Sequence, residues 1–364
     1  MRIAFLSWRD TTHPDGGGSE VYVEQVAAGL AARGHVVTVL CAAHPGAADV
    51  TVRDGFRIVR RGGRLTVYLR GLAYLLSPAG RRTDAVVDVV NGLPFAAPLV
   101  RRRGLVALVH HLHREQWRII YPGAWGRVGW FVESRVVPRL YRRVPFVTVS
   151  EASRRDLSGI GVDTHRVSVV RNGTPPLPVP LLPRSTTPRL CVLSRLVPHK
   201  RIEQVLAVVD ELRDRHPGLV LDVVGDGWWA DELDAEIARR GLGDMVVRHG
   251  RVDEQTKADV LGRAWVMVLP SVREGWGISV MEAAAAGTPT VAYGSAGGTA
   301  ESVVDGVTGV LVHDEAALLR AVADLLVDAA TRERLGRAAR ERAATFGWDE
   351  AAAGVEMVLE TYSP

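Results

Sequence analysis

The chain has 364 residues, of which 47% are hydrophobic and 24% charged, and its formal net charge is +4. This length favours two domains, and the composition excludes a disordered chain or a disulfide scaffold. No apolar run reaches the roughly 18 residues that span a bilayer, and the two cysteines, Cys41 and Cys191, stand far apart in apolar runs. We therefore expect a cytoplasmic protein with free thiols.

The charge is distributed unevenly along the chain. Residues 1–173 carry 25 arginines against 13 acidic residues, net +12, and residues 174–364 carry 20 basic against 28 acidic residues, net −8. The basic half predicts an anionic partner, either a phosphorylated acceptor or the inner face of a membrane that the protein touches peripherally; a solvated arginine-rich surface is the alternative. The arginine clusters lack a recognition motif, so we expect no nucleic acid. Only Lys200 and Lys257 are lysines.

Apolar runs alternate with amphipathic stretches in the first half. The expected strands are 2–7, 35–41, 86–90, 105–109, 145–149 and 167–170, with helices such as 19–33 and 127–142. Continuous apolar strands separated by helices predict a parallel sheet that is covered on both faces.

The loop after the first strand is rich in glycine. Gly16, Gly17 and Gly18 let a ligand approach the backbone, Ser19 can cap the helix that follows, and a helix N-terminus favours anions. A dinucleotide fingerprint would place its glycines directly after the strand, whereas these come ten residues later, so a dehydrogenase is a weak alternative. A plain flexible loop is the other.

The strand over 105–109 ends in a histidine cluster, His110, His111 and His113. No cysteine or carboxylate completes a familiar zinc spacing, so we expect hydrogen bonding or proton transfer there, and no metal. The loop beyond carries rings that could stack on an acceptor or pack in the core: Trp117, Tyr121 and Trp125.

Six prolines in residues 174–188 predict an extended linker between a domain over 1–173 and a domain over 189–345. The second half repeats the alternation. Its expected strands are 189–194, 219–224, 245–249, 265–269, 289–292 and 310–312, and its expected helices are 202–215, 230–240, 253–263, 277–286 and 315–328. The helical tail is interrupted at 346–347, and we expect residues 346–364 to pack back on the first domain.

Two loops of the second half carry charges suited to a nucleotide sugar. Arg195 and Lys200 precede a helix, and two cations at a helix N-terminus favour a diphosphate, with plain surface charge as the alternative. Glu274 lies in a loop and Glu282 in the following helix, seven residues intervening. The first could accept hydrogen bonds from a hexose and the second from a ribose; a helix cap and a surface carboxylate are the alternatives.

Over nearly the whole chain, these features resemble the family-four retaining glycosyltransferases of GT-B architecture, also called group 1. The resemblance is carried by Arg195, Lys200, the turn over 225–227, residues 250–252, Glu274 and Glu282 within EGWGISVMEAAAAGTPTVA, the GGGSE loop, His110, SEASRRDL and residues 171–173. It implies an α/β fold of two Rossmann-like, doubly wound domains that face each other across a crevice.

The resemblance also implies roles for the donor-binding residues. Arg195 and Lys200 would bind the donor diphosphate, Glu274 would contact the donor sugar, and Glu282 would bind the ribose. The further donor positions are Arg251 and Val252, whose backbone would hold the base, Gly17 and Gly18, which would approach the diphosphate from the other domain, and Gly225, Gly275, Trp276, Gly277 and Ile278.

The catalytic set implied by the resemblance adds His110 to Arg195, Lys200 and Glu274. His111 stands where the family often has aspartate, so the active histidine is His110 or His111, and we favour His110 because it directly follows the strand. The acceptor-side residues are His111, Trp117 and Tyr121.

The activity implied is transfer of a hexose from a nucleotide diphosphate sugar to a hydroxyl of a sugar, a lipid-linked or a natural-product acceptor. The anomeric configuration would be retained by front-face attack, with no metal or other cofactor. The alternatives are a sugar-nucleotide epimerase of the same architecture, a non-catalytic sugar-nucleotide-binding module, and a phosphorylase. Phosphorylase would need a pyridoxal lysine, and Lys257 stands in a predicted helix away from the strand-end loops.

Overall fold

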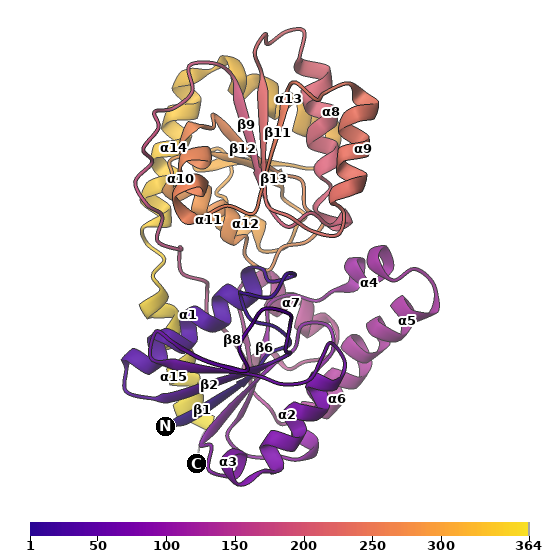
Figure 1. Cartoon of the computed structure of the whole chain (residues 1–364), viewed down its shortest axis with the longest axis vertical. Helices are drawn as coiled ribbons and strands as arrows, with labels where there is room; N and C mark the ends of the chain where they lie inside the picture. Colours follow the sequence, from indigo (N-terminus) through magenta and orange to yellow (C-terminus); the bar gives the residue numbers. More distant parts are fainter. Residues whose placement is uncertain (363–364) are drawn as a thin grey trace. The chain divides into compact units, whose positions relative to one another are not determined.

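The computed structural model describes residues 1–362. Its contacts divide the chain into two compact units (Figure 1). Unit 1 contains residues 1–173 and the chain from residue 347 onward, and unit 2 contains residues 174–346. Within the described residues, no helix combines the length and apolarity needed to cross a membrane.

Unit 1 is built on an eight-stranded sheet with the order β3-β4-β2-β1-β5-β6-β7-β8, in which every pairing is parallel except β3 with β4. The strands are β1 (Arg2–Leu6), β2 (Val36–Cys41), β3 (Val50–Arg53), β4 (Phe56–Arg60), β5 (Ala85–Val89), β6 (Leu105–Val109), β7 (Phe146–Thr148) and β8 (Val167–Val169). Strands β5 and β6 are buried along their whole length, as expected for a sheet covered on both faces.

The helices of unit 1 flank this sheet. They are α1 (Gly18–Ala32), α2 (Thr66–Leu76), α3 (Pro78–Arg81), η1 (Ala97–Leu99), α4 (Arg114–Ile120), α5 (Ala124–Phe131), η2 (Val132–Val136), α6 (Val137–Leu140), α7 (Glu151–Gly159), η3 (Thr164–Arg166) and α15 (Trp348–Tyr362). Helix α15 packs on α1, where the Tyr22 and Trp348 ring centroids lie 6.1 Å apart and His35 Nε2 lies 2.6 Å from Glu356 Oε1.

Two features of unit 1 differ from the sequence-based expectation. The helix expected over 127–142 runs from 124 to 140 and is interrupted by the π-helical turn η2, where Ser134 Oγ donates to the Trp130 carbonyl oxygen at 2.6 Å. Strands β3 and β4 were not expected. They form a hairpin around Asp54 and Gly55, whose φ angles of 48° and 79° suit a two-residue turn.

Unit 2 has a parallel six-stranded sheet with the order β11-β10-β9-β12-β13-β14. The strands are β9 (Arg189–Leu193), β10 (Val220–Val224), β11 (Val246–Gly250), β12 (Val266–Leu269), β13 (Thr290–Tyr293) and β14 (Gly309–Val312). The helices are η4 (Pro198–Lys200), α8 (Ile202–Leu212), α9 (Ala230–Arg240), α10 (Glu254–Arg263), α11 (Ile278–Ala285), α12 (Thr299–Ser302), α13 (Glu315–Val327) and α14 (Ala329–Ala343). This is the doubly wound order in which the chain changes direction between neighbouring strands β9 and β12.

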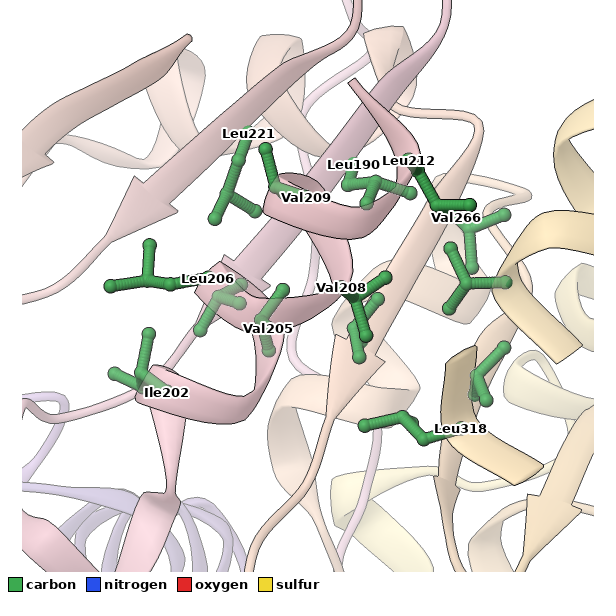
Figure 2. Close-up of a cluster of buried hydrophobic side chains, with 14 of the residues drawn as sticks. Leu190, Ile202, Val205, Leu206, Val208, Val209, Leu212, Leu221, Val266 and Leu318 are labelled. Atoms are coloured by element: carbon green, nitrogen blue, oxygen red, sulfur yellow. The ribbon is translucent and has the colours of Figure 1, made fainter. Parts of the chain in front are cut away.

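Helix α8 shows how the sequence builds the core of unit 2. Its buried residues follow the spacing of one helix face: Ile202, Val205, Leu206, Val208, Val209 and Leu212. They gather in one cluster with apolar strand side chains that include Leu190 and Leu221 (Figure 2).

Residues 174–188, expected as a linker, contain no helix or strand, and their contacts assign them to unit 2. The backbone N–H of Ser185 donates to the Arg263 carbonyl oxygen at 3.1 Å, and Trp265 Nε1 donates to the Ser185 carbonyl oxygen at 2.7 Å. The Leu181 N–H donates to Asp259 Oδ1 at 2.6 Å. The segment is therefore held along the surface of unit 2 by hydrogen bonds.

Candidate functional site

The candidate site of unit 2 lies at the point where the strand order of its sheet reverses. Strands β9 and β12 are neighbours, and the loops at their carboxyl ends carry Lys200 and Glu274 respectively. In open α/β sheets, ligands bind outside the carboxyl ends of the strands at this point. The topology therefore places residues separated by 74 positions in one candidate site.

Lys200 and Glu274 form an ion pair, with Lys200 Nζ 2.5 Å from Glu274 Oε1. Lys200 ends the short helix η4, and Arg201 takes the left-handed conformation, φ 51°, before α8 begins. The Val272 N–H donates to the His199 carbonyl oxygen at 2.9 Å, which ties the two loops together. Arg195 is half-buried in the same loop as Lys200.

The backbone at Glu274 is fixed by the loop that follows β13. Its N–H donates to the Ala296 carbonyl oxygen at 2.9 Å, and its carbonyl oxygen accepts from the Gly298 N–H at 3.0 Å. A Cβ at Gly298 would lie 1.9 Å from the Gly275 carbonyl oxygen, so only glycine permits this approach. The backbone that carries the Glu274 carboxylate is therefore hydrogen-bonded on both sides to the loop after β13.

Gly225 serves packing between loops. Its φ is +120°, and an added Cβ would lie 1.9 Å from the Ser194 carbonyl oxygen. The Gly225 N–H donates to the Gly250 carbonyl oxygen at 2.8 Å, which brings the loop of Arg251 and Val252 beside it. Arg251 is exposed, whereas Val252 packs partly against the core of unit 2.

Glu282, on α11, is buried and paired with Lys257 of α10, whose Nζ lies 2.6 Å from Glu282 Oε1 and 2.7 Å from Glu254 Oε2. Burial raises the pKa of Glu282, and the ammonium of Lys257 opposes part of that rise. Burial acts to lower the pKa of Lys257, but its two carboxylate neighbours outweigh burial and raise the pKa. Glu282 is therefore a buried carboxylate stabilised by one cation.

The turn that opens α11 contains three of the expected donor-binding residues, Trp276, Gly277 and Ile278. Gly277, at φ +96°, is the N-cap, and Ile278 is the first helical residue. Trp276 is buried with its ring centroid 5.1 Å from that of Phe346. The sequence assigned Trp276 to donor binding; because its indole packs inward, we expect a donor to meet the main chain there.

In unit 1, the glycine loop leads into α1 with Gly17 as the N-cap, so the expectation of a Ser19 cap is wrong. Glu20 explains the difference, because its buried carboxylate accepts from the Gly17 N–H at 2.7 Å and from Ser19 Oγ at 2.9 Å. Arg9 Nε lies 3.4 Å from the same carboxylate. Gly18 is the first residue of the helix.

His110 follows β6 and is 5% exposed. Its Nδ1 lies 3.3 Å from Asn91 Oδ1, its carbonyl oxygen accepts from Ser153 Oγ at 2.7 Å, and its ring meets that of Tyr22 edge-on at 5.2 Å. Nε2 is buried and has no hydrogen-bond partner within residues 1–362. Burial lowers the pKa of His110 to about 4, against a smaller opposing effect of Glu20. The imidazole is therefore neutral, and a proton on Nδ1 leaves Nε2 as an acceptor.

Each of the other acceptor-side candidates has a hydrogen-bond partner within unit 1. His111 Nε2 lies 2.9 Å from Gln116 Nε2, and Tyr121 bonds through its hydroxyl to Arg64. Trp117 Nε1 donates to Glu133 Oε2 at 3.0 Å, and a Cβ at Gly129 would lie 2.4 Å from the Trp117 ring. The Trp117 ring is half-buried within unit 1, which fits the core-packing alternative.

Sequence reasoning missed several residues of these sites. Glu133 also accepts from the His113 backbone N–H at 2.9 Å, and Asn91 orients His110. Lys257, which the sequence placed away from the strand-end loops, contacts Glu282; its rarity as one of two lysines was the available signal. In the described part of the chain, no three His, Cys, Asp or Glu side chains are grouped so as to hold a metal ion.

Comparison with known proteins gives matches over both units. Residues 17–173 match the model of the glycosyl transferase 4-like domain, and residues 177–342 match that of glycosyl transferases group 1. The MMP alpha-(1->4)-mannosyltransferase of Mycolicibacterium hassiacum is 31% identical, with 99% of this chain and 98% of the relative covered.

Solved structures show similarity of fold. Sucrose-phosphate synthase from Thermosynechococcus elongatus superposes with a TM-score of 0.85 at 22% identity, covering 99% of this chain and 98% of that chain. HepE of Anabaena, solved in complex with UDP-glucose, gives a TM-score of 0.73 at 19% identity, covering 99% of both chains.

Proposed function

Since this chain belongs to the group 1 glycosyltransferases and has their GT-B fold, we propose that it transfers a hexose from a nucleoside diphosphate sugar to an acceptor hydroxyl. The observation that carries the proposal is the Lys200–Glu274 ion pair at the point where the strand order of unit 2 reverses. In this pair, a cation suited to binding phosphate lies 2.5 Å from a carboxylate suited to binding sugar hydroxyls.

The proposed donor site lies in unit 2. Lys200 and Arg195 neutralise the diphosphate and stabilise the charge that develops on it as the glycosidic bond breaks. Glu274 accepts hydrogen bonds from the hexose, and Glu282 accepts them from the ribose. The binding of UDP-glucose by HepE and the mannosyl transfer in the name of the mannosyltransferase support this class of donor.

Unit 1 contributes the acceptor side in this proposal. His110 is neutral over the physiological range because its pKa lies near 4, so its buried Nε2 accepts a hydrogen bond from a substrate hydroxyl. A neutral imidazole suits a retaining, front-face reaction in which the departing diphosphate takes the acceptor proton. The proposed acceptors are sugars, lipid-linked sugars and natural products, and the reaction needs no metal.

The first experiment is a thermal-stabilisation screen with UDP-, GDP- and ADP-hexoses. A donor at about 100 times its Kd stabilises a protein by about 2.7 kcal/mol, which raises Tm by several degrees. The donor identified is then incubated with each acceptor class, and the anomeric proton of the first product is followed by NMR. Transfer with the α configuration kept supports the proposal; no stabilisation by any nucleotide sugar contradicts it, and an inverted product contradicts retention.

A further inference from the structure

The helical segment over residues 114–143 has an unusual charge composition. It contains seven arginines, two glutamates, and neither lysine nor aspartate, which gives a net charge of +5. One of the glutamates, Glu133, is buried and bonded to His113 and Trp117. The surface that this segment presents is therefore almost entirely cationic or apolar.

Large apolar side chains of the same segment are exposed. Trp125 is 77% exposed, Val128 51% and Phe131 57%, at a spacing of three residues along α5. Val136, the last residue of the π-helical turn η2, is exposed as well. Residues three and four apart share one face of a helix, so these side chains form an apolar stripe where a soluble helix would carry polar residues.

Arginines stand beside this stripe. Arg127, Arg135 and Arg139 are exposed on the same helical run. Phe131, Arg135, Val136, Arg139 and Leu140 line one shallow hollow, and Arg135, Pro138, Arg139 and Arg142 line part of a second. Cationic and apolar groups thus border the same depressions.

We propose that this α5–α6 face, defined by Trp125, Arg127, Val128, Phe131, Arg135, Val136 and Arg139, docks on an anionic lipid surface. Aromatic and aliphatic side chains enter the boundary between headgroups and acyl chains, while guanidinium groups contact lipid phosphates. Such docking would place the enzyme at a membrane and does not depend on the sugar-transfer reaction. A second copy is a poorer occupant, since a symmetric dimer would set the same arginines against each other.

Co-sedimentation with vesicles tests the proposal without any donor or acceptor. The probes are vesicles of phosphatidylcholine alone and vesicles with about 30% phosphatidylglycerol, at about 50 mM and about 500 mM NaCl. We expect binding to the anionic vesicles at low salt, little binding to neutral vesicles, and a partition coefficient that falls at high salt.

Two pairs of substitutions assign the binding to the α5–α6 face. Each arginine near an anionic surface raises partitioning about fivefold, so R135Q/R139Q should bind anionic vesicles about 20- to 30-fold more weakly. W125S/F131S should also bind anionic vesicles more weakly than the wild type. This difference should remain at high salt, because salt does not screen the burial of apolar area. The matched controls are R102Q/R103Q, two exposed arginines of unit 1 outside this face, and M357S, an exposed apolar residue of α15.

Circular dichroism confirms that each variant is folded before it is compared. The proposal is overturned if wild-type protein ignores anionic vesicles, if it binds neutral and anionic vesicles equally at both salt concentrations, or if the controls lose as much binding as the α5–α6 variants. It is also overturned if sedimentation analysis shows a dimer that W125S/F131S converts to a monomer, since the face is then a contact between copies.

Discussion

At the scale of single residues, the two lysines show how strongly the second unit is organised around two carboxylates. Of 45 basic residues only Lys200 and Lys257 are lysines, and each pairs with one of the glutamates that flank the turn into α11. A lysine ammonium is a compact point charge, whereas arginine is a planar fork. Each compact cation lies beside one carboxylate, Lys200 beside the half-buried Glu274 and Lys257 beside the buried Glu282.

The Lys200–Glu274 pair leads to the first prediction. Lys200→Ala and Glu274→Ala should each lower kcat/KM about 10²-fold, because each removes a charged or hydrogen-bonding contact near the leaving group. Steady-state kinetics with the donor found by the stabilisation screen measures the effect. Glu232→Ala, an exposed carboxylate of α9, is the control and should retain wild-type kinetics. Near-wild-type turnover in a folded Lys200 or Glu274 variant would show that the residue is not part of the site.

A second prediction concerns Lys257 as a positioning residue. Lys257→Met should raise the Kd of the nucleoside diphosphate about tenfold, because loss of the cation raises the pKa of buried Glu282 further and protonates it. Calorimetry with UDP, GDP and ADP measures this. Raising the pH should then restore part of the affinity, since the carboxylate reforms.

The control for Lys257 is Glu254→Gln, which removes its other, exposed partner and should leave affinity unchanged. A purely structural role for Lys257 would weaken binding equally at every pH, and that result would contradict the prediction.

His110 gives a third prediction, on stability. Its pKa is about 4 in the folded chain and near 6.5 when unfolded, so the unfolded state binds more protons between these values. The contribution of neutral His110 to the free energy of unfolding is therefore fully present above pH 6.5 and is lost as the pH falls toward 4. Between pH 7 and pH 5 the free energy of unfolding of the wild type should fall by about 2 kcal/mol more than that of His110→Gln, as measured by urea unfolding. Equal losses in both proteins would mean that His110 is protonated in the folded state.

At the scale of elements, helices α1 and α15 approach each other closely at Gly29. A Cβ at Gly29 would lie 2.5 Å from Ala352 Cβ. Gly29→Leu should lower the free energy of unfolding by about 1–3 kcal/mol, since overpacking displaces the helices. Gly159→Ala, where an added Cβ meets nothing within 4 Å, is the control and should cost no stability. Chemical denaturation compares them, and unchanged stability of Gly29→Leu would show that α15 does not pack closely there.

Elements with a strong internal pattern were predictable, and short ones less so. Helix α11 was expected over 277–286 and spans Ile278–Ala285, because apolar periodicity and the glycine before it are local signals. The β3–β4 hairpin carried the local signal of Asp54-Gly55, which the sequence interpretation did not use. The π-helical turn had no such signal, because the burial of Glu133 against His113 and Trp117 depends on packing.

At the scale of the whole molecule, the proposal assigns donor binding to unit 2 and the acceptor side to unit 1, and this assignment can be tested directly. Residues 174–346 form a continuous unit with its own core and carry Lys200, Glu274 and Glu282. Expressed alone, this unit should unfold cooperatively and be stabilised by the nucleoside diphosphate, yet transfer no sugar, because His110 belongs to unit 1. Thermal unfolding and a transfer assay measure both properties. A folded unit 2 without nucleotide binding would show that unit 1 supplies essential contacts.

The sequence by itself determined the two doubly wound sheets and the loops that carry the candidate site. Alternating apolar runs and helices are local patterns, and charged or glycine-rich loops after strands can be read without coordinates. These signals pointed to Lys200, Glu274 and Glu282, whereas His110 was favoured over His111 only through the family resemblance and its place directly after a strand.

Only the tertiary structure decided which of these residues meet and in what state. The Lys257–Glu282 pair joins two helices through residues that are 25 positions apart in the sequence. The inward packing of Trp276 and the lowered pKa of His110 follow from burial. The exposed stripe on α5 likewise follows from which helix faces the sheet leaves uncovered. These particular pairings and burials depend on contacts between distant segments, which no local pattern in the chain encodes.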